Sequence, residues 1–361
     1  MNVLLLSGQL GSGGAPRVCY QVARHLPDDV DLQVAYLGGR DGLVEKFEAE
    51  SIPVERLAED MLSVSAARAF DKHLRENDYD VVHTHMISAA LIGRPIARLH
   101  RIPVVHTVHT NYKMRPLTAK LPDVLTAPFA NRAVCVSDSV ARSLPWYYFA
   151  DTEVIYNCID VEAVREAGAI PWDDLEWTAD LDPDAPVVAN VARFDPKKRR
   201  IDLVEGFEHT LNNIPDAQLV LTGRTGKRQQ RLENRAIELG IADNVHFVGF
   251  VDNPQSVYYH ADVIALPSKA EGFSISMLEA MAHQVPIVAS NIPAFVDALG
   301  EDYPAFVPVE SPRALGRELS QALSDQSYSE NMTSIINERI ERFSGKNAAQ
   351  AYARTFRSVI T

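Results

Sequence analysis

Two glutamates stand eight positions apart in the segment EGFSISMLE, where both could lie around the start of a helix. We expect the helix to begin near Phe273 or Ser274. Gly272 then allows close approach of the backbone, and the first helical amides are donors without an intrahelical acceptor. Glu271 precedes this helix, and Glu279 lies about one and a half turns into it. The two carboxylates could accept hydrogen bonds from the hydroxyls of a hexose and a ribose. Alternatively, both are solvated helix carboxylates, with Glu271 near the positive end of the helix dipole.

A run of basic residues, Arg193-Phe-Asp-Pro-Lys-Lys-Arg-Arg200, follows the apolar stretch Val187–Val191. The carboxyl end of a parallel strand faces the ligand crevice in open α/β sheets. Cations at such an end suit a pyrophosphate, and Arg offers a bidentate fork. The other interpretation is a solvated basic loop before a helix. The position of the run directly after a strand favours the phosphate-binding interpretation.

Glycines follow the first apolar stretch, Val3–Leu6, in the segment GQLGSGGAPR. Gly13 and Gly14 could let backbone amides approach a phosphate at a helix start. The dinucleotide fingerprint GxGxxG is incomplete because Pro16 stands where its last glycine is required. A tight structural turn is the alternative to an anion site.

Four histidines form two pairs in the first half of the chain. His83 and His85 share one face of an expected strand, while His106 and His109 lie at the end of the next one. Four imidazoles could bind zinc, but no carboxylate or Cys accompanies them locally. We therefore expect one site histidine beside core or loop histidines, and no metal.

Apolar runs of strand length alternate with amphipathic stretches along the whole chain, which predicts parallel sheets covered by helices. Two helical patterns in the first half are Arg17–Leu26 and Ser88–Leu99. The expected strands are Val3–Leu6, Leu32–Leu37, Val81–Thr84, Val104–Val108, Ala133–Val136, Val187–Val191, Leu219–Thr222, Val245–Val248, Val263–Leu266 and Ile287–Ala289.

The alternation breaks at a stretch rich in Pro, Trp and acidic residues, which predicts two consecutive doubly wound domains. We expect residues 1–165 and 185–345 to form the domains, with 166–184 as a linker or insertion. Two such units facing one another would place a ligand in the cleft between them.

The 361 residues carry a net charge of −13, which argues against nucleic-acid binding. The excess acid lies in the second part of the chain, and residues 81–122 contain no Asp or Glu. The basic residues of 86–120 could face an anionic membrane surface or simply form solvated helix faces. Three isolated cysteines, with no apparent signal peptide or membrane-spanning run, predict a cytoplasmic chain, peripheral to the membrane at most.

Taken in order, these segments resemble the GT-B glycosyltransferases, specifically the large retaining family four. The resemblance covers nearly the whole chain. Its most specific mark is the pair of glutamates with seven residues between them, and its other parts are the Gly-Gly loop, His-Thr-Val-His at 106–109, Val136-Ser137, Val154-Ile155-Tyr156-Asn157 with Asp160, and Arg193 with Lys198.

The resemblance implies a role for each matching residue. Gly13 and Gly14 would line the donor phosphate, and His109 would position the donor sugar. Arg193 and Lys198 would grip the pyrophosphate. The remaining donor-binding positions would be Glu271 and the amides of Gly272, Phe273, Ser274 and Ile275 for the hexose, Glu279 for the ribose, and Gly223 with Arg224 beside the nucleotide.

The activity implied is transfer of a hexose or N-acetylhexosamine from a nucleotide sugar, with UDP favoured over GDP, to a glycan or lipid-linked acceptor. The family is thought to react by front-face attack with retention and without metal or other cofactor. Surface polysaccharide or lipopolysaccharide synthesis would be the setting, and the last helix, 346–361, would cross back onto the first domain. Arg199 replaces the family's usual glycine and leaves the phosphate contacts open.

Three other functions fit parts of the sequence. A nucleotide-sugar 2-epimerase shares the architecture, although the spacing of the two glutamates favours a transferase. A non-catalytic GT-B binding module would be expected to have lost one of His109, Arg193, Lys198 or Glu271. A nicotinamide-dependent oxidoreductase would be expected to have a complete GxGxxG.

Overall fold

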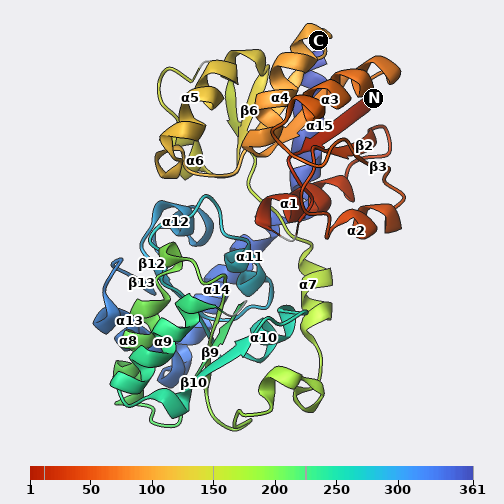
Figure 1. Ribbon diagram of the computed structural model, residues 1–361. Coiled ribbons are helices and arrows are strands. Elements are labelled where there is room, and N and C mark those ends of the chain that lie inside the picture. Colours follow the sequence, from red (N-terminus) through yellow and green to blue (C-terminus); the bar gives the residue numbers. More distant parts are fainter. Residues whose placement is uncertain (12, 149, 224–225, 361) are drawn as a thin grey trace. The chain divides into compact units, whose positions relative to one another are not determined.

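The computed structural model describes residues 1–11, 13–148, 150–223 and 226–360, and the chain divides into two compact units (Figure 1). The first unit is Met1–Ile159 with Phe343–Thr361, and the second is Asp160–Arg342. Each unit holds its own parallel sheet with helices packed on it. The expected pair of doubly wound α/β domains is therefore confirmed.

In the first unit, the described strands form a sheet in the order β3-β2-β1-β4-β5-β6-β7. The order reverses direction between β1 and β4, and such a switch point is where open α/β sheets bind ligands. The strands are β1 Asn2–Ser7, β2 Asp31–Tyr36, β3 Val54–Arg56, β4 Val81–His85, β5 Val104–Val108, β6 Arg132–Cys135 and β7 Thr152–Val154. The helices are α1 Gly14–Ala23, α2 Val44–Ala49, α3 Val64–Glu76, α4 Met86–Leu99, α5 Leu117–Thr126, α6 Asp138–Ser143 and α15 Gly345–Ile360.

In the second unit, the described strands follow the order β10-β9-β8-β11-β12-β13, with the switch point between β8 and β11. The strands are β8 Val187–Val191, β9 Gln218–Thr222, β10 Val245–Gly249, β11 Val263–Leu266, β12 Ile287–Ser290 and β13 Phe306–Val307. The helices are α7 Val161–Gly168, α8 Arg200–Leu211, α9 Lys227–Glu238, α10 Gln255–His260, α11 Ile275–Ala282, α12 Pro293–Leu299, α13 Pro312–Ser324 and α14 Gln326–Ile340.

The units change between residues 159 and 160, and again between 342 and 343, which differs from the expected boundaries. Residues 166–184 belong to the second unit rather than to a separate linker. Trp177 is buried there and donates to Ser256 Oγ at 3.0 Å. The side chain of Gln218 bonds both backbone groups of Asp182. The Pro-rich composition thus marks a packed segment that holds, besides the end of α7, only two short 3-10 helices, Trp172–Asp174 and Glu176–Thr178.

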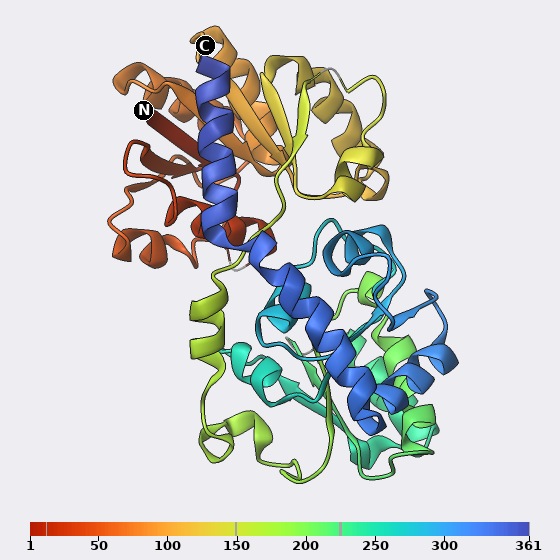
Figure 2. The same ribbon diagram turned by 180° about the vertical axis from the view of Figure 1, so that it is seen from behind.

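The last helix, α15, belongs to the first unit and lies along one face of its sheet (Figure 2). It contacts α1, β4 and β5. Tyr352 and Phe356 are both 1% exposed, and their rings lie 4.9 and 5.1 Å from the ring of His83. Burial of two aromatic side chains is worth several kcal/mol, so α15 is part of the core of this unit.

Two arginines of the acid-free segment are buried in the first unit. Arg94 is 0% exposed, and its Nη1 lies 2.7 Å from Asp123 Oδ1. Arg115 pairs with the other oxygen of the same buried carboxylate, and Arg94 Nη2 donates to Tyr148 at 2.8 Å. Arg94 therefore fastens α4 to α5, Arg115 fastens the segment before α5 to that helix, and neither contributes to a basic surface. Arg98, Arg101 and Lys113 stay exposed.

No helix in the part of the chain that the structure describes is both long enough and apolar enough to cross a bilayer.

Candidate active site

Arg200, the last residue of the basic run, fixes the loop between β8 and α8 through hydrogen bonds. Arg200 is 4% exposed and donates to the side-chain oxygen of Asn190 at 2.7 Å and to the carbonyls of Ala192 and Thr222. Asn190 in turn donates to Ala265 in β11 at 2.7 Å. Burial lowers the pKa of Arg200 to about 9. Arg200 thus joins the ends of β8 and β9 and is not available to a ligand.

Arg199 has a left-handed backbone, with φ of 50° and ψ of 36°, and it forms the corner between the short turn Pro196–Lys198 and α8. Its guanidinium pairs with Asp202 at 2.6 Å and approaches Glu310 at 3.6 Å. The departure from glycine is therefore accommodated by acidic partners within the unit. Arg193 is exposed, and its guanidinium forms no hydrogen bond or ion pair with any described residue.

The switch point of the second sheet brings Lys198 and Glu271 together. Lys198 Nζ lies 2.7 Å from Glu271 Oε1, with the two side chains 14% and 9% exposed. Lys198 follows β8 and Glu271 follows β11, and the two loops are also joined by the amide of Lys269, which donates to the carbonyl of Lys197 at 2.8 Å. A fixed cation and carboxylate thus stand side by side at the carboxyl ends of adjacent strands.

Helix α11 begins one residue after the expected start. Ser274 caps it by accepting from the amide of Met277 at 3.3 Å. Ser276 Oγ donates to the carbonyl of Val191 at 3.1 Å, which ties the first turn of α11 to the end of β8. The amides of Gly272, Phe273, Ser274 and Ile275 therefore lie at the helix start beside Glu271, as the spacing predicts.

Glu279 is only 5% exposed and already has protein partners. Its Oε1 accepts from Gln255 Nε2 at 2.9 Å, and its Oε2 accepts from the hydroxyl of Tyr258 at 3.1 Å. His283 Nε2 lies 3.2 Å from Gln255 Oε1. Gln255 and Tyr258 could not be predicted from the sequence because α10 carries no motif. Each carboxylate oxygen can accept more than one hydrogen bond, so this network orients Glu279.

Gly223 directly follows β9 and has a φ of +145°, which favours glycine. A Cβ there would stand 2.6 Å from the carbonyl oxygen of Ala192 and 3.1 Å from the ring of Phe194. Any side chain would therefore displace the loop that carries Arg193. Arg224, the neighbouring predicted residue, lies outside the described residues, as does Ser12 in the first glycine loop.

In the first unit, the glycine loop joins β1 to α1 at the switch point of the sheet. Gly13 is the N-cap of α1, and no side chain caps this helix. A Cβ at Gly13 would meet only Pro16 Cδ, at 3.9 Å, so packing within the described residues does not require glycine there. Gly14 is the first residue of the helix.

In the structure, three of the four histidines form one hydrogen-bonded row, and His106 lies apart from it. His85 Nδ1 lies 2.8 Å from His109 Nε2, and His85 Nε2 lies 3.4 Å from His83 Nδ1. His106 faces Thr84 separately, at 2.9 Å. Burial is the main cause that lowers the pKa of His83 and His109 to about 3 and the pKa of His85 and His106 well below the usual 6.5. All four rings are therefore neutral near pH 7.

The chain matches two family descriptions that together span most of its length: "Glycosyltransferase Family 4" over residues 12–163 and "Glycosyl transferases group 1" over residues 173–339. The chain belongs to the family 4 glycosyltransferases. The resemblance inferred from the sequence is thus confirmed.

Several family 4 relatives have curated names. The chain is 29% identical over 234 residues to UDP-Gal:alpha-D-GlcNAc-diphosphoundecaprenol alpha-1,3-galactosyltransferase of Escherichia coli, a match covering 61% of this chain and 60% of that protein. It is 25% identical to phosphatidyl-myo-inositol mannosyltransferase of Mycolicibacterium smegmatis, with 81% and 74% covered. The chain therefore spans about three fifths of the length of the first of these relatives.

Solved structures of this family's fold superpose over the whole chain. Anabaena HepE in complex with UDP and glucose gives a TM-score of 0.85 at 20% identity, with 99% of this chain and 100% of that chain covered. Sucrose-phosphate synthase of Thermosynechococcus elongatus gives 0.79 at 19% identity, with 99% and 98% covered. The expected GT-B fold is confirmed.

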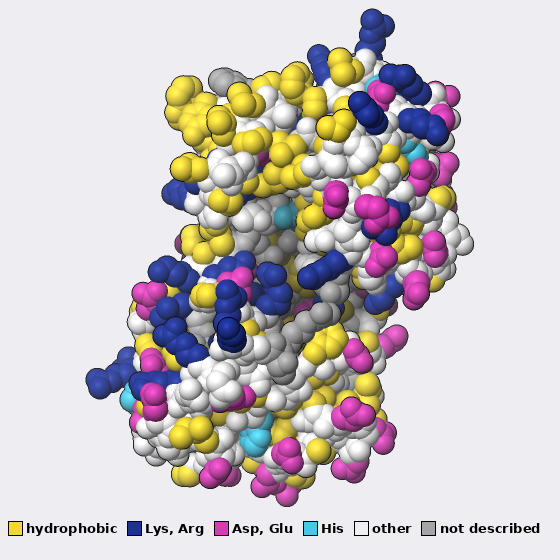
Figure 3. Space-filling view, viewed as in Figure 1, with side chains coloured by type: hydrophobic (Ala, Val, Ile, Leu, Met, Phe, Trp, Pro, Cys, Tyr) yellow, Lys and Arg dark blue, Asp and Glu magenta, His cyan; other side chains and the backbone are white. Residues whose placement is uncertain are grey.

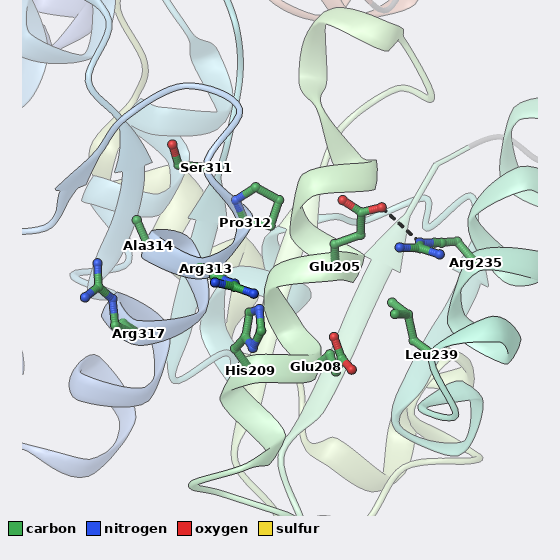
Figure 4. Close-up of a pocket in the computed structure, with 10 residues that line it drawn as sticks. All are labelled: Glu205, Glu208, His209, Arg235, Leu239, Ser311, Pro312, Arg313, Ala314 and Arg317. Carbon is green, nitrogen blue, oxygen red and sulfur yellow. Dashed lines mark hydrogen bonds and ion pairs between the residues drawn. The ribbon is translucent and has the colours of Figure 1, made fainter.

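A pocket elsewhere in the second unit does not coincide with the candidate site. It lies between α8, α9 and the start of α13, where Glu205 and Arg235 pair at 2.9 Å (Figure 4). None of the predicted site residues lines it, and its walls are helix flanks rather than strand ends. Among the described residues, no group of three or more His, Cys, Asp or Glu is arranged as a metal site.

The buried histidines predict a pH dependence of stability. Because the pKa of His83 is lower in the folded protein than in the unfolded chain, the unfolded chain binds more protons between about pH 6.5 and 3. The unfolding free energy should therefore fall as the pH falls through this window. His83 alone should account for about 2 kcal/mol between pH 7 and pH 5. Urea denaturation at both pH values measures the loss, which should be smaller in His83→Gln. Equal losses in the two proteins would contradict this assignment.

Proposed function

We propose that this chain transfers a hexose or N-acetylhexosamine, with retention, from a nucleoside diphosphate sugar to a glycan or lipid-linked acceptor. UDP is the favoured nucleotide and GDP the second candidate. The observation that carries the proposal is the contact of Lys198 with Glu271 at the switch point of the second sheet, beside the start of α11. A cation for the pyrophosphate and a carboxylate for the sugar hydroxyls stand where α/β sheets bind nucleotides.

The reaction breaks the bond between the anomeric carbon and a phosphate oxygen, and negative charge develops on the leaving diphosphate. Lys198 and the exposed Arg193 would stabilise that charge, which removes the need for a metal ion. Glu271 and the amides of Gly272–Ile275 would hold the hexose, and Glu279 would hold the ribose. His109 and the glycine loop belong to the first unit, so the proposed reaction needs both units.

The acceptor is proposed from two sources. The Escherichia coli and Mycolicibacterium smegmatis relatives are named for a diphosphoundecaprenol acceptor and a phosphatidyl-myo-inositol acceptor. In this chain, α5 exposes Leu117, Leu121 and Leu125 by 80%, 65% and 64%, at a spacing of four that aligns them on one face. Peripheral association with a membrane during surface polysaccharide or lipopolysaccharide synthesis would fit both.

The apolar surface of the first unit gathers over α5 and α6, where hydrophobic side chains crowd together in Figure 3. Trp146, just after α6, is 90% exposed. Lys113 is exposed beside this region, and Asp123, the acid of α5, is buried. Apolar side chains with a Trp and nearby lysines suit the interface of an anionic bilayer. The membrane surface expected from the charges of 86–120 is therefore now proposed for the α5 face.

Loss of either partner of the Lys198–Glu271 pair should impair transfer. We expect Lys198→Ala and Glu271→Ala each to lower turnover at least tenfold with the fold intact, since each removes a contact to the transferring group (about 1.4 kcal/mol per tenfold). Release of nucleoside diphosphate, measured over a panel of donors with acceptor extracts, reports the rate. Lys269→Ala is the matched control, because Lys269 lies in the same loop and its ammonium pairs, among the described residues, only with the exposed Glu310.

Near wild-type turnover in either variant would remove the role assigned to that residue. A chelator should leave the wild-type rate unchanged, and strong inhibition would contradict a metal-independent reaction. A donor that epimerises in the absence of any acceptor would instead indicate the 2-epimerase.

The α5 face should bind anionic vesicles. We expect the wild-type protein to sediment with phosphatidylglycerol vesicles at low salt, and the double variant Leu121→Asp/Leu125→Asp to stay in the supernatant, because charge at these positions opposes insertion. Ile237→Asp is the control, since Ile237 is 65% exposed on α9 of the second unit. Failure of the wild-type protein to sediment would contradict membrane binding by the α5 face. Equal sedimentation of the wild-type protein and the double variant would contradict it as well.

A further inference from the structure

A continuous row of hydrogen bonds leads from His109 into the core of the first unit. His109 Nε2 and His85 Nδ1 are 2.8 Å apart, and His85 Nε2 and His83 Nδ1 are 3.4 Å apart. The row continues from His83 Nε2 to Thr107 Oγ1 at 2.8 Å and ends at the hydroxyl of Tyr352 on α15, 3.0 Å from Thr107 Oγ1. Apart from the half-buried His109, every member is at most 1% exposed.

The buried end of this row fixes the direction of its protons. Among the described residues, the hydroxyl of Tyr352 has Thr107 Oγ1 as its one hydrogen-bond partner. A buried hydroxyl proton without an acceptor is costly, so Tyr352 donates to Thr107. The hydroxyl proton of Thr107 then has to go to His83 Nε2, its other partner.

The direction passes from ring to ring because each neutral imidazole carries one proton. His83 accepts at Nε2, so its proton is on Nδ1 and is donated to His85 Nε2. His85 in turn carries its proton on Nδ1 and donates it to His109 Nε2. The opposite direction would leave the Tyr352 hydroxyl proton buried without an acceptor. The depressed pKa values of the three rings agree with their being neutral.

We propose that Thr107 and Tyr352 are positioning residues that hold His109 as the Nδ1–H tautomer, so that His109 presents a hydrogen-bond donor and no basic nitrogen. No described residue bonds to Nδ1 of His109, which leaves that N–H for a ligand. This step rests on the proposed function: the N–H would donate to an oxygen of the donor sugar or its phosphate. His109 is then a donor to the ligand, and it is not the base that receives the acceptor's proton.

Tautomers can be measured directly on protein labelled with ¹⁵N-histidine, because long-range ¹H–¹⁵N correlation spectra distinguish Nδ1–H from Nε2–H. Signals are assigned by His→Gln substitutions at residues 83, 85 and 109. We expect all three rings of the ligand-free wild-type protein to be Nδ1–H. A wild-type His109 with its proton on Nε2 would overturn the proposal without any variant.

Thr107→Val tests the cause, because valine keeps the shape of threonine and removes the hydroxyl that donates to His83. We expect a clear Nε2–H fraction at His109 in this variant. Thr355→Val is the matched control: Thr355 is also buried, and its hydroxyl bonds Glu153 rather than the histidines. A Thr107→Val spectrum identical to that of the wild type would show that the hydroxyls do not set the tautomer.

The role in transfer has its own readout. Turnover should fall roughly fivefold in Thr107→Val, since a smaller share of the protein holds the competent tautomer, and should stay at the wild-type level in Thr355→Val. A shifted tautomer with unchanged turnover would overturn the positioning role. Absence of transfer in the wild-type protein with every donor would defeat the proposed function and leave the spectroscopic result standing.

Discussion

The ion pair of Lys198 with Glu271 joins the two loops on which the second unit's site depends. Both loops leave adjacent parallel strands at the same edge of the sheet, and the 2.7 Å contact between two largely buried side chains holds them together. Taking two charges out of water is expensive, and removing one leaves the other uncompensated. The desolvation cost of this ion pair is understandable if the two side chains also bind a charged ligand. A diphosphate beside Lys198 and sugar hydroxyls beside Glu271 would each replace part of the contact.

The surroundings of that pair explain why it has a fixed position. Arg200, buried under the loop, bonds the ends of β8 and β9, and Ser276 bonds the end of β8 from the start of α11. Gly223 lets the backbone of β9 pass within reach of Ala192. Glu279 is oriented in the same way by Gln255 and Tyr258. Residues proposed to bind the ligand are thus supported by residues with partners in the protein, as a preorganised site requires.

Much of this could be read from the sequence because periodicity and spacing report local structure. Every strand expected from an apolar run is present, and α11 begins within two residues of its expected start. The short strands Val54–Arg56 and Thr152–Val154 were missed since none of their residues is buried and they give no apolar run. The boundaries near 165 and 345 also differ from those of the structure, because composition does not tell a linker from an irregular packed segment.

Long-range partners could not be predicted in this way. Basic residues of one run divide between the loop at the carboxyl edge of the sheet and the core, and nothing in the run distinguishes Arg200 from Lys198. From the sequence, Arg94 and Arg115 are expected to be surface charges. In the structure both pair with Asp123, which lies just beyond the acid-free segment. The histidine row depends on Tyr352, a residue more than 240 positions away from Thr107. Such contacts follow from topology rather than from local pattern.

The most direct test of the central claim is a thermal-shift panel of UDP, GDP, ADP, NAD and the common sugar conjugates of the nucleoside diphosphates. A ligand that binds the folded protein increases its unfolding free energy by RT ln(1 + [L]/Kd) and so raises its melting temperature. The account predicts stabilisation by one nucleoside diphosphate, UDP first, and a larger shift with one of its sugars. Stabilisation by NAD alone, or by none of these compounds, would contradict a nucleotide-sugar site.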